Sequence, residues 1–214
     1  TCPAYFGENE RNATKIAGEI AGLNVKDIIN EPTAAALSYG IEKDLDQVVL
    51  VYDLGGGTFD VSLIQIKQGS ITVVVTGGDH NLGGKNWDDA LTQYFANEFK
   101  KKTGGQINIL DDSKVSGEME LSAESVKKTL TLKDKAKTRI VFDTDRVDVE
   151  VSRDQFDTLT SYFLGRAEML TDKLMEEAKN KGINTFDKIL MVGGSTRMPQ
   201  VKESLSKAFP GIPI

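Results

Sequence analysis

The sequence predicts an α/β protein, in which strands and helices alternate along one chain. Two mainly apolar runs, Val48–Tyr52 and Lys188–Val192, have the composition of strands that are buried on both faces. Apolar residues recur at helical spacing over residues 85–102 and 153–181, which indicates amphipathic helices. Strands and helices that alternate in this way are typical of the α/β class.

Composition narrows the class of protein further. The 214 residues are 39% hydrophobic and 27% charged, which is ordinary for a globular chain and excludes a disordered one. No apolar run approaches the roughly 18 residues of a membrane span. The formal net charge of −6 argues against a nucleic-acid binder. Cys2 is the only cysteine, so we predict a reducing, cytoplasmic location. His80 is the only histidine, which excludes multi-histidine metal sites.

The first 47 residues predict two helices and one short strand. Residues 8–22 have the apolar spacing of a helix. Val25–Ile29 is a short apolar strand candidate. A second helix follows over Thr33–Tyr39, with Pro32 in its first turn, where a missing N–H costs little. Glu42–Gln47 is a charged linker to the next element.

The middle of the chain predicts a sheet followed by helices. The runs Val48–Tyr52, Phe59–Ile66 and Ile71–Thr76 are separated by short turns, which predicts an antiparallel meander. A helix is expected from about Lys85 to Lys102, with its apolar side chains in the core. The charged segment 113–137 is predicted to be mainly helical.

The last third predicts a hairpin, a long helix, a strand and a final helix. The hairpin pairs Arg139–Phe142 with Val147–Val151, which alternates strictly. Ser152 and Gln155 have the spacing of a capping box, which predicts a helix from there to about Lys181. The buried strand Lys188–Val192 then leads through glycines into a helix at about Pro199–Phe209.

The segment Asp53–Asp60 is the first candidate binding site. Three glycines follow a buried strand, and acidic and hydroxyl side chains flank them; these residues are Asp53, Gly55, Gly56, Gly57, Thr58 and Asp60. Successive peptide N–H groups can cradle a phosphate, and carboxylates can hold a divalent cation through water. The alternative is an ordinary hairpin turn. A dinucleotide fingerprint and a P-loop are both excluded, because those motifs run from a strand into a helix.

A second candidate lies at residues 191–199, where a buried strand meets a helix N-terminus through Gly193 and Gly194. Helix N-termini of this kind bind anions, and Arg197 could stack on a base or bind a phosphate. The alternative is a tight connection that Ser195 or Thr196 caps.

These two segments, with Thr1–Phe6, Ile28–Ala36, Leu82–Gly84 and Glu124–Leu130, resemble the nucleotide-binding domain of the seventy-kilodalton heat-shock chaperones, in the same order and spacing. The resemblance implies a truncated actin-like ATPase (ribonuclease H-like) fold, with a mixed sheet flanked by helices. Residues 1–44 would end the first lobe. Residues 45–83 and 162–214 would form the core of the second lobe, and residues 84–161 its α+β outer subdomain.

The resemblance also implies roles for particular residues. The glycines at 55–57 and Thr58 would bind the β- and γ-phosphates of ATP or ADP. Asp53 and Asp60 would lie near Mg²⁺ or K⁺, held through water, and Glu31 near the attacking water. The nucleoside would contact Gly84, Glu124, Lys127, Lys128, Gly193, Gly194, Ser195 and Arg197. Pro3 and Arg11 would relay the nucleotide state to the peptide-binding domain. Without the resemblance, residues 124–130 are a solvated helix face, and Pro3 and Arg11 are ordinary surface residues.

The implied function is that of an ATP-driven molecular chaperone in protein folding and the stress response. Unfolded peptides would bind a domain beyond Ile214, and a J-domain co-chaperone and a nucleotide exchange factor would be partners. The first phosphate loop and the catalytic lysine would lie upstream of Thr1, so we expect this chain alone to hydrolyse ATP negligibly. The alternatives are a nucleotide-sensing module without turnover and a sugar-kinase-like enzyme of the same superfamily.

The chain also departs from the family pattern. Where the family usually has Thr-His before Leu82, this chain has His80-Asn81, and where it usually has Glu-Asp after Gly84, this chain has Lys85-Asn86. These changes indicate a somewhat diverged member. His80 itself is interpreted as a loop residue.

Overall fold

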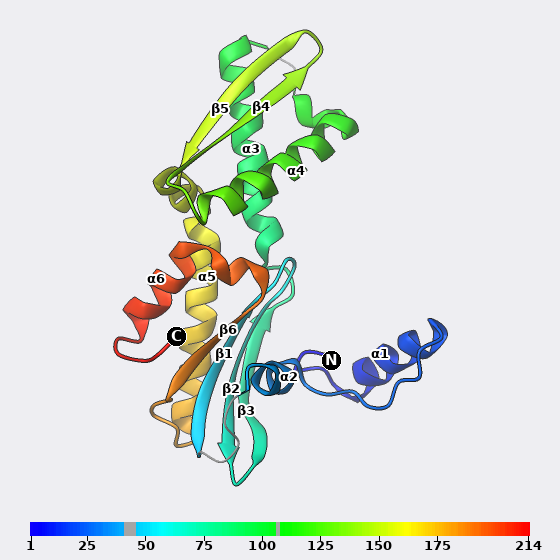
Figure 1. Cartoon of the computed structure of the whole chain (residues 1–214), viewed down its shortest axis with the longest axis vertical. Helices are drawn as coiled ribbons and strands as arrows, with labels where there is room; N and C mark the ends of the chain where they lie inside the picture. The colour runs from blue at the N-terminus through cyan, green and yellow to red at the C-terminus, as the bar shows by residue number, and fades with distance from the viewer. Residues whose placement is uncertain (41–45, 106–107) are drawn as a thin grey trace.

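The computed structural model describes residues 1–40, 46–105 and 108–214. The molecule is elongated, with a four-stranded sheet at one end and a helical pair with a two-stranded hairpin at the other (Figure 1). The N-terminal segment projects to one side of the sheet (Figure 1). The predicted α/β class is confirmed, with a mixed sheet flanked by helices.

The large sheet has the strand order β3-β2-β1-β6. Strands β1 (Gln47–Leu54), β2 (Phe59–Lys67) and β3 (Ser70–Asp79) form the predicted antiparallel meander, and β6 (Lys188–Val192) lies parallel to β1. Asp53 pairs directly with Asp60 across β1 and β2, at the end of the sheet that leads into the glycine loop. Residues directly opposite each other share a face of the sheet, so these two carboxylates are neighbours.

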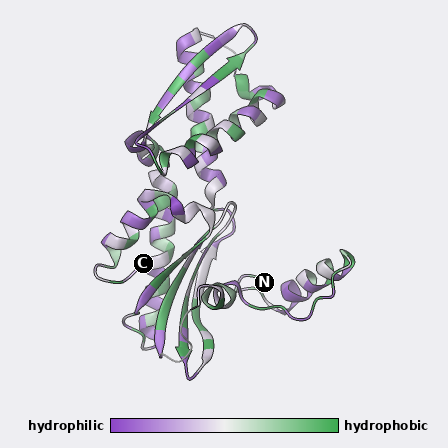
Figure 2. Ribbon diagram, in the orientation of Figure 1, coloured by the Kyte–Doolittle hydropathy of each residue, from purple (hydrophilic) through white to green (hydrophobic). Residues whose placement is uncertain are grey.

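Helices cover both faces of this sheet, which explains why the central run Val48–Tyr52 of β1 is apolar without interruption. On one face, Leu50 and Leu54 pack in the same cluster as Leu174 of α5 (Arg153–Asn180) and Leu205 of α6 (Pro199–Ala208). On the other face, Val49 packs in a cluster with Ala36 of α2 (Glu31–Ser38). Figure 2 shows hydrophobic residues running along the strands between these layers.

The other end of the molecule contains α3 (Gly84–Thr103), η1 (Ile109–Asp111), α4 (Ser113–Leu130) and the hairpin of β4 (Lys135–Phe142) and β5 (Asp145–Ser152). Alternate hairpin residues are buried against the helices. Helix α5 starts at this hairpin with the predicted capping box of Ser152 and Gln155, and it runs down to the large sheet (Figure 1). Helices α3 and α5 therefore connect the two ends.

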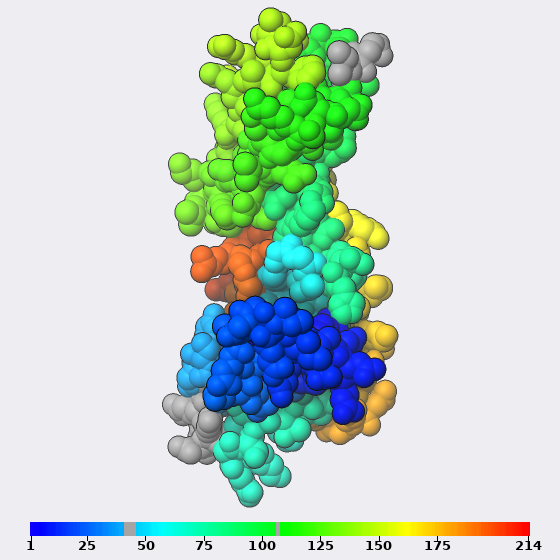
Figure 3. Space-filling view, turned by 90° about the vertical axis from the view of Figure 1, so that its right-hand side faces the viewer, coloured from blue at the N-terminus to red at the C-terminus, as the bar shows by residue number. Residues whose placement is uncertain are grey.

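The N-terminal segment contains α1 (Glu8–Ile20), which has no buried residue. In Figure 3 this segment faces the reader in front of the large sheet, and the outer elements lie above it. The predicted strand Val25–Ile29 is wrong, since only an isolated bridge joins Asn30 to Cys2. A strand needs a neighbour along its length, and the short Thr1–Cys2 segment provides only one pairing.

One further prediction is corrected by the structure, and another falls mostly on residues that the structure does not describe. The segment 113–137 is not helical to its end, because α4 stops at Leu130 and β4 begins at Lys135. Most of the predicted linker Glu42–Gln47 lies outside the described residues, and Gln47 already belongs to β1.

A 3₁₀ turn, η2 (Gly194–Arg197), precedes α6. None of the helices in the described part of the chain combines the length and apolar character needed to cross a membrane.

Candidate functional site

The glycine loop between β1 and β2 is held in place by two distant segments. The Gly55 carbonyl accepts hydrogen bonds from the Gly84 N–H (2.9 Å) and from the Ser195 hydroxyl (2.9 Å). The Gly56 carbonyl accepts from the Lys85 N–H at 2.8 Å. The first turn of α3 and the η2 turn are thereby fixed to the loop that we predicted to bind phosphate.

Glycine is required where these three segments meet, because backbone packs directly against backbone. A Cβ atom on Gly83 would lie 2.5 Å from the Gly57 backbone, and one on Gly84 would lie 2.3 Å from Ser195 Oγ. Gly193 has φ +86°, and a Cβ there would lie 2.3 Å from the Leu54 carbonyl oxygen. A side chain at Gly83 or Gly193 would therefore require the backbone to move, whereas one at Gly84 would displace the Ser195 side chain.

Three carboxylates lie close together beside the loop. Burial raises the pKa of Asp53, and the negative charge of Asp60 raises it further. Burial also raises the pKa of Glu31, at the start of α2, and the charges of Asp60 and Asp53 add to this effect. Each group would be stabilised in its charged form by a cation.

Asp60 is the central member of this cluster. Burial raises its pKa, while hydrogen bonds with Tyr5 and Thr58 lower it. Its Oδ1 atom is buried and has no hydrogen-bond partner among the described residues. An unpaired buried oxygen next to two further carboxylates suits a hydrated divalent cation. Among the described residues, no three His, Cys, Asp or Glu side chains are arranged to hold a metal ion directly.

The N-terminal segment contacts this cluster. The Glu31 N–H donates to the Cys2 carbonyl at 2.9 Å, which places Pro3 next to the start of α2. The Arg11 guanidinium donates to the Phe6 carbonyl (2.9 Å) and to Asn30 Oδ1 (2.6 Å). The two residues predicted to act as a relay therefore both lie one or two contacts from Glu31.

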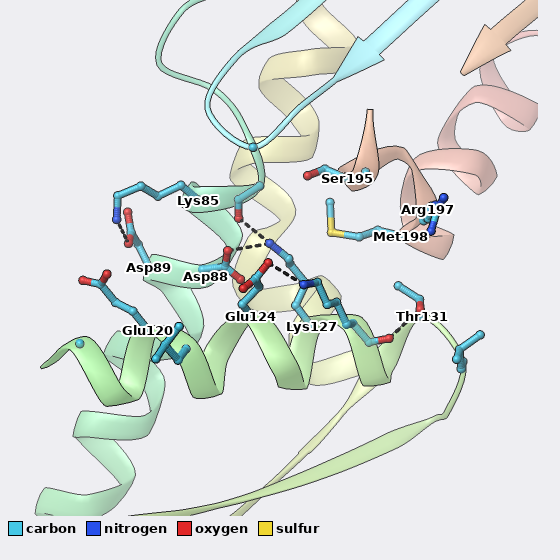
Figure 4. A pocket seen from close by; sticks show the side chains of 17 residues that line it. Lys85, Asp88, Asp89, Glu120, Glu124, Lys127, Thr131, Ser195, Arg197 and Met198 are labelled. Carbon is cyan, nitrogen blue, oxygen red and sulfur yellow. Dashed lines mark hydrogen bonds and ion pairs between the residues drawn. The ribbon is translucent and has the colours of Figure 1, made fainter. Parts of the chain in front are cut away.

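A cavity of about 910 Å³ opens between the start of α3, the helix α4 and the η2 turn (Figure 4). Most of the residues predicted to bind the nucleoside line it. They come from all three elements, and they are Gly84, Glu124, Lys127, Lys128, Gly194, Ser195 and Arg197. Gly56 of the glycine loop, which we predicted to bind phosphate, lines the cavity as well. Gly193, Gly55, Gly57 and Thr58 lie outside this lining, in the adjoining loops.

Lys127 is the fixed charge of this cavity. Its ammonium group donates to Asp88 Oδ2 at 2.6 Å and to the Gly84 carbonyl at 3.1 Å, and its side chain is only 11% exposed (Figure 4). Burial raises the pKa of Asp88 although the Lys127 ion pair opposes it. Lys128 instead forms an exposed ion pair with Glu124, at 2.7 Å, which lowers the pKa of that carboxyl.

Sequence reasoning missed several residues at the site. Asp88 supports Lys127, and Thr131 and Met198 line the cavity. Asp88 could have been found, because it lies one helical turn after Gly84 and faces the same side. Burial, and then the nearby charge of Asp60, raise the pKa of the Tyr5 hydroxyl, and no local pattern signals that these two residues lie close together.

The two departures after Gly84 have structural roles. Asn86 Oδ1 accepts from the Gly83 N–H at 2.8 Å and so caps α3. The Lys85 side chain pairs with Asp89 at 2.8 Å, at the edge of the cavity.

A comparison of the sequence with protein-family models identifies the family to which this chain belongs. A family model described as "Hsp70 protein" matches residues 1–213, which is essentially the whole chain. The chain belongs to the Hsp70 family. This confirms the resemblance that the sequence motifs carried. The Hsp70 family has the actin-like ATPase fold, binds nucleotide with Mg²⁺, and works with peptide clients, J-domain proteins and exchange factors in general.

Proposed function

We propose that this chain is the ATP-binding portion of an ATP-driven molecular chaperone, and that the adenosine end of the nucleotide occupies the cavity between α3, α4 and η2. The observation that supports this proposal most is that several distant segments meet around one cavity. Backbone from the glycine loop, from Gly84 and from Gly194 meets the charged side chains of α4 around one cavity of about 910 Å³. The phosphates would then extend along residues 55–58, towards the carboxylates.

Each wall of the cavity has a distinct task in this proposal. Lys127 supplies a positive charge whose position Asp88 holds, and Glu124 and Lys128 supply polar groups on the same helix. Arg197 offers a planar guanidinium that can stack on a base. Gly84 and Gly194 let a ligand approach the backbone closely.

The carboxylates would act at the phosphate end. Asp53 and Asp60 would hold the water shell of Mg²⁺ or K⁺, and Mg²⁺ would neutralise charge on the phosphates when it is bound. Glu31 would orient the attacking water. Thr58 would donate its hydroxyl to a phosphate oxygen. In this proposal only the intact chaperone hydrolyses ATP. The alternative is a module that senses nucleotide without hydrolysing it.

The proposed division of the chain gives the nucleotide a mechanical role. Residues 84–161 would be an outer subdomain above the core formed by 45–83 and 162–214, and residues 1–44 would belong to the other lobe. The cavity is lined from both sides of the boundary at residue 84. A bound nucleotide would therefore bias the angle between the parts, and Pro3 and Arg11 would pass this on to a peptide-binding domain. The J-domain and exchange-factor partners and a cytoplasmic location belong to the same proposal.

Calorimetric titration of the chain with Mg-ATP, with Mg-GTP as the comparison, tests the proposal. Gly194 lines the cavity, and a Cβ there would have nothing within 4 Å, so Gly194→Val fills ligand space without a clash. We expect ATP-selective binding that this variant weakens by about tenfold or more. Gly165→Val in α5 is the matched control, because a Cβ there is equally free and Gly165 does not line the cavity. Equal loss in both variants would contradict the assignment of the cavity.

A further inference from the structure

Gln200 joins helix α6 to helix α5 through a buried side chain. It is the second residue of α6 and is only 5% exposed. Its Nε2 atom donates to Asp157 Oδ1 at 2.8 Å and to Thr160 Oγ1 at 3.2 Å. Both N–H bonds of one amide group therefore reach acceptors on α5 that lie one helical turn apart.

The partners of Gln200 fix the orientation of its amide group. An ionised carboxylate only accepts hydrogen bonds, so the nitrogen of the amide, and not its oxygen, faces Asp157. The Thr160 hydroxyl donates its single proton to the Phe156 carbonyl at 2.8 Å, so its oxygen can accept from Gln200. Hydrogen bonds to a carboxylate are stronger than those between neutral groups. Gln200 is thus a donor, and Asp157 is its main acceptor.

These hydrogen bonds cross the boundary between two parts of the molecule. In the proposed division, Asp157 and Thr160 lie at the end of the outer subdomain, and Gln200 belongs to the core. A further hydrogen bond between the same two helices, from the Ser204 hydroxyl to Glu168 at 2.6 Å, lies within the core. A movement of the outer subdomain away from the core would therefore break the Gln200 bonds and leave the Ser204 bond intact.

The same boundary runs through the cavity. Helix α4 lines the cavity from the outer part, and the segment from Gly194 to Met198 lines it from the core. Gln200 follows Met198 by two residues, so its hydrogen bonds hold this segment in place relative to the outer part. A ligand between the two walls stays enclosed as long as the walls keep their separation.

We propose that Gln200, Asp157 and Thr160 form a clasp that keeps the outer subdomain closed over the cavity and slows the release of bound nucleotide. Gln200 is a positioning residue here, because it does not line the cavity and acts through the placement of η2 relative to α4. The effect on nucleotide release rests on the proposed function, whereas the clasp itself does not.

Substitutions of Gln200 separate hydrogen bonding from packing. Gln200→Glu keeps the shape of the side chain but places a second carboxylate against Asp157, so the clasp should open. Gln200→Leu removes the donor without adding a charge and should open the clasp less. Gln200→Glu combined with Asp157→Asn exchanges donor and acceptor, and this pair should close the clasp again. Ser204→Ala is the matched control, because it removes a hydrogen bond between the same helices within the core.

Distances between two spin labels test the clasp without nucleotide. Cys2 is buried, so cysteines introduced at the exposed positions Val141 in the hairpin and Lys202 in α6 can be labelled selectively. We expect the distances to become longer or more broadly distributed in Gln200→Leu and still more so in Gln200→Glu. The exchanged pair and Ser204→Ala should keep the natural distribution. Equal distributions in the natural chain and in Gln200→Glu would overturn the clasp. A Gln200→Leu chain more open than Gln200→Glu would also overturn it, because that order indicates packing alone.

Stopped-flow release of a fluorescent ADP analogue links the clasp to the cavity. Gln200→Leu should accelerate release by about tenfold, as expected when a hydrogen bond to a charged group is lost, and Gln200→Glu should accelerate it further. The exchanged pair and Ser204→Ala should release at the natural rate. Unchanged release from a Gln200→Glu chain that the spin labels show to be open would overturn the link to nucleotide. If no chain bound nucleotide, the proposed function would fail, and the distances would still decide the clasp.

Discussion

At the scale of single residues, the site depends on polar groups that are held by one specific partner. Lys127 and Asp88 are both largely buried, at 11% and 17% side-chain exposure, and their ion pair is 2.6 Å long. A pair in this environment adds little stability by itself, but removal of one partner leaves the other charge uncompensated. The pair therefore holds the Lys127 ammonium group in the cavity, and this position depends on Asp88 remaining its partner.

This predicts an asymmetric response to substitution. Lys127→Met should lower the free energy of unfolding by about 3 kcal/mol, because Asp88 is left buried without its partner. The double substitution Lys127→Met with Asp88→Leu should recover most of that loss, although ATP binding stays weak. Urea denaturation of the single and double variants measures both effects. If the double variant were less stable than the single one, Asp88 would not be the source of the penalty.

At the scale of elements, the start of α3 both joins the glycine loop and contains its own cap. Its first N–H groups bond the carbonyls of the glycine loop, and its third helical residue, Asn86, caps the helix through the Gly83 N–H. Where the family usually has aspartate, the asparagine amide oxygen provides the same acceptor without the charge. The departure that seemed to weaken the motif in sequence thus preserves the cap in structure.

Substitution of Asn86 separates the cap from the charge. Asn86→Ala should cost about 1 kcal/mol of stability, the usual value for a lost N-terminal cap. Asn86→Asp should be at least as stable as the natural chain, because a negative charge at a helix N-terminus is favourable. Asn97→Ala, at an exposed position later in the same helix, is the control and should change stability by less than about 0.5 kcal/mol. Thermal denaturation compares the three variants, and equal losses at 86 and 97 would show that the cap is unimportant.

At the scale of the whole molecule, the fold brings together three carboxylates, from α2, β1 and β2, and the charge of the N-terminal amino group offsets only part of their effect on Glu31. The pKa values of Glu31, Asp53 and Asp60 are all raised. The folded chain therefore binds more protons than the unfolded chain just above the ordinary carboxyl range. These groups favour folding at acidic pH, and this contribution is lost as the pH rises through their raised pKa values. Like many functional sites, the cluster lowers the free energy of unfolding at neutral pH and in return can bind a ligand.

Asp53→Asn tests this trade. Without Mg²⁺ at pH 7, we expect the variant to be more stable than the natural chain by about 1 kcal/mol, because one like charge is removed from the cluster. The difference should shrink as the pH falls through the raised pKa values of the cluster, because the carboxyls of the folded chain then become protonated and lose their mutual repulsion. Asp148→Asn is a control of opposite sign, because the Arg139 hydrogen bond lowers the pKa of Asp148. Guanidinium denaturation at several pH values measures these differences, and a destabilised Asp53→Asn chain at pH 7 would contradict the like-charge account.

Much of the fold could be predicted because it is encoded in local patterns. The meander of β1 to β3, the long helices α3 and α5 and the capping box of Ser152 follow from periodicity, turn spacing and side-chain type, which need only a few neighbouring residues. The glycine loops also stand out locally, since three adjacent glycines after a buried strand indicate close backbone approach. The errors occur where local signals are weak: the apolar run at 25–29 forms no strand, because pairing partners, not composition, decide whether a strand exists.

The sequence by itself determined the class of fold, the family motifs and the types of residue at the site. Only the tertiary structure decided which of them meet. The Lys127–Asp88 pair, the packing of Gly83 on Gly57 and the Tyr5–His80 contact each join segments that are tens of residues apart. Such contacts depend on how elements pack in three dimensions, and packing is set by the sum of many weak interactions that no short stretch of sequence contains.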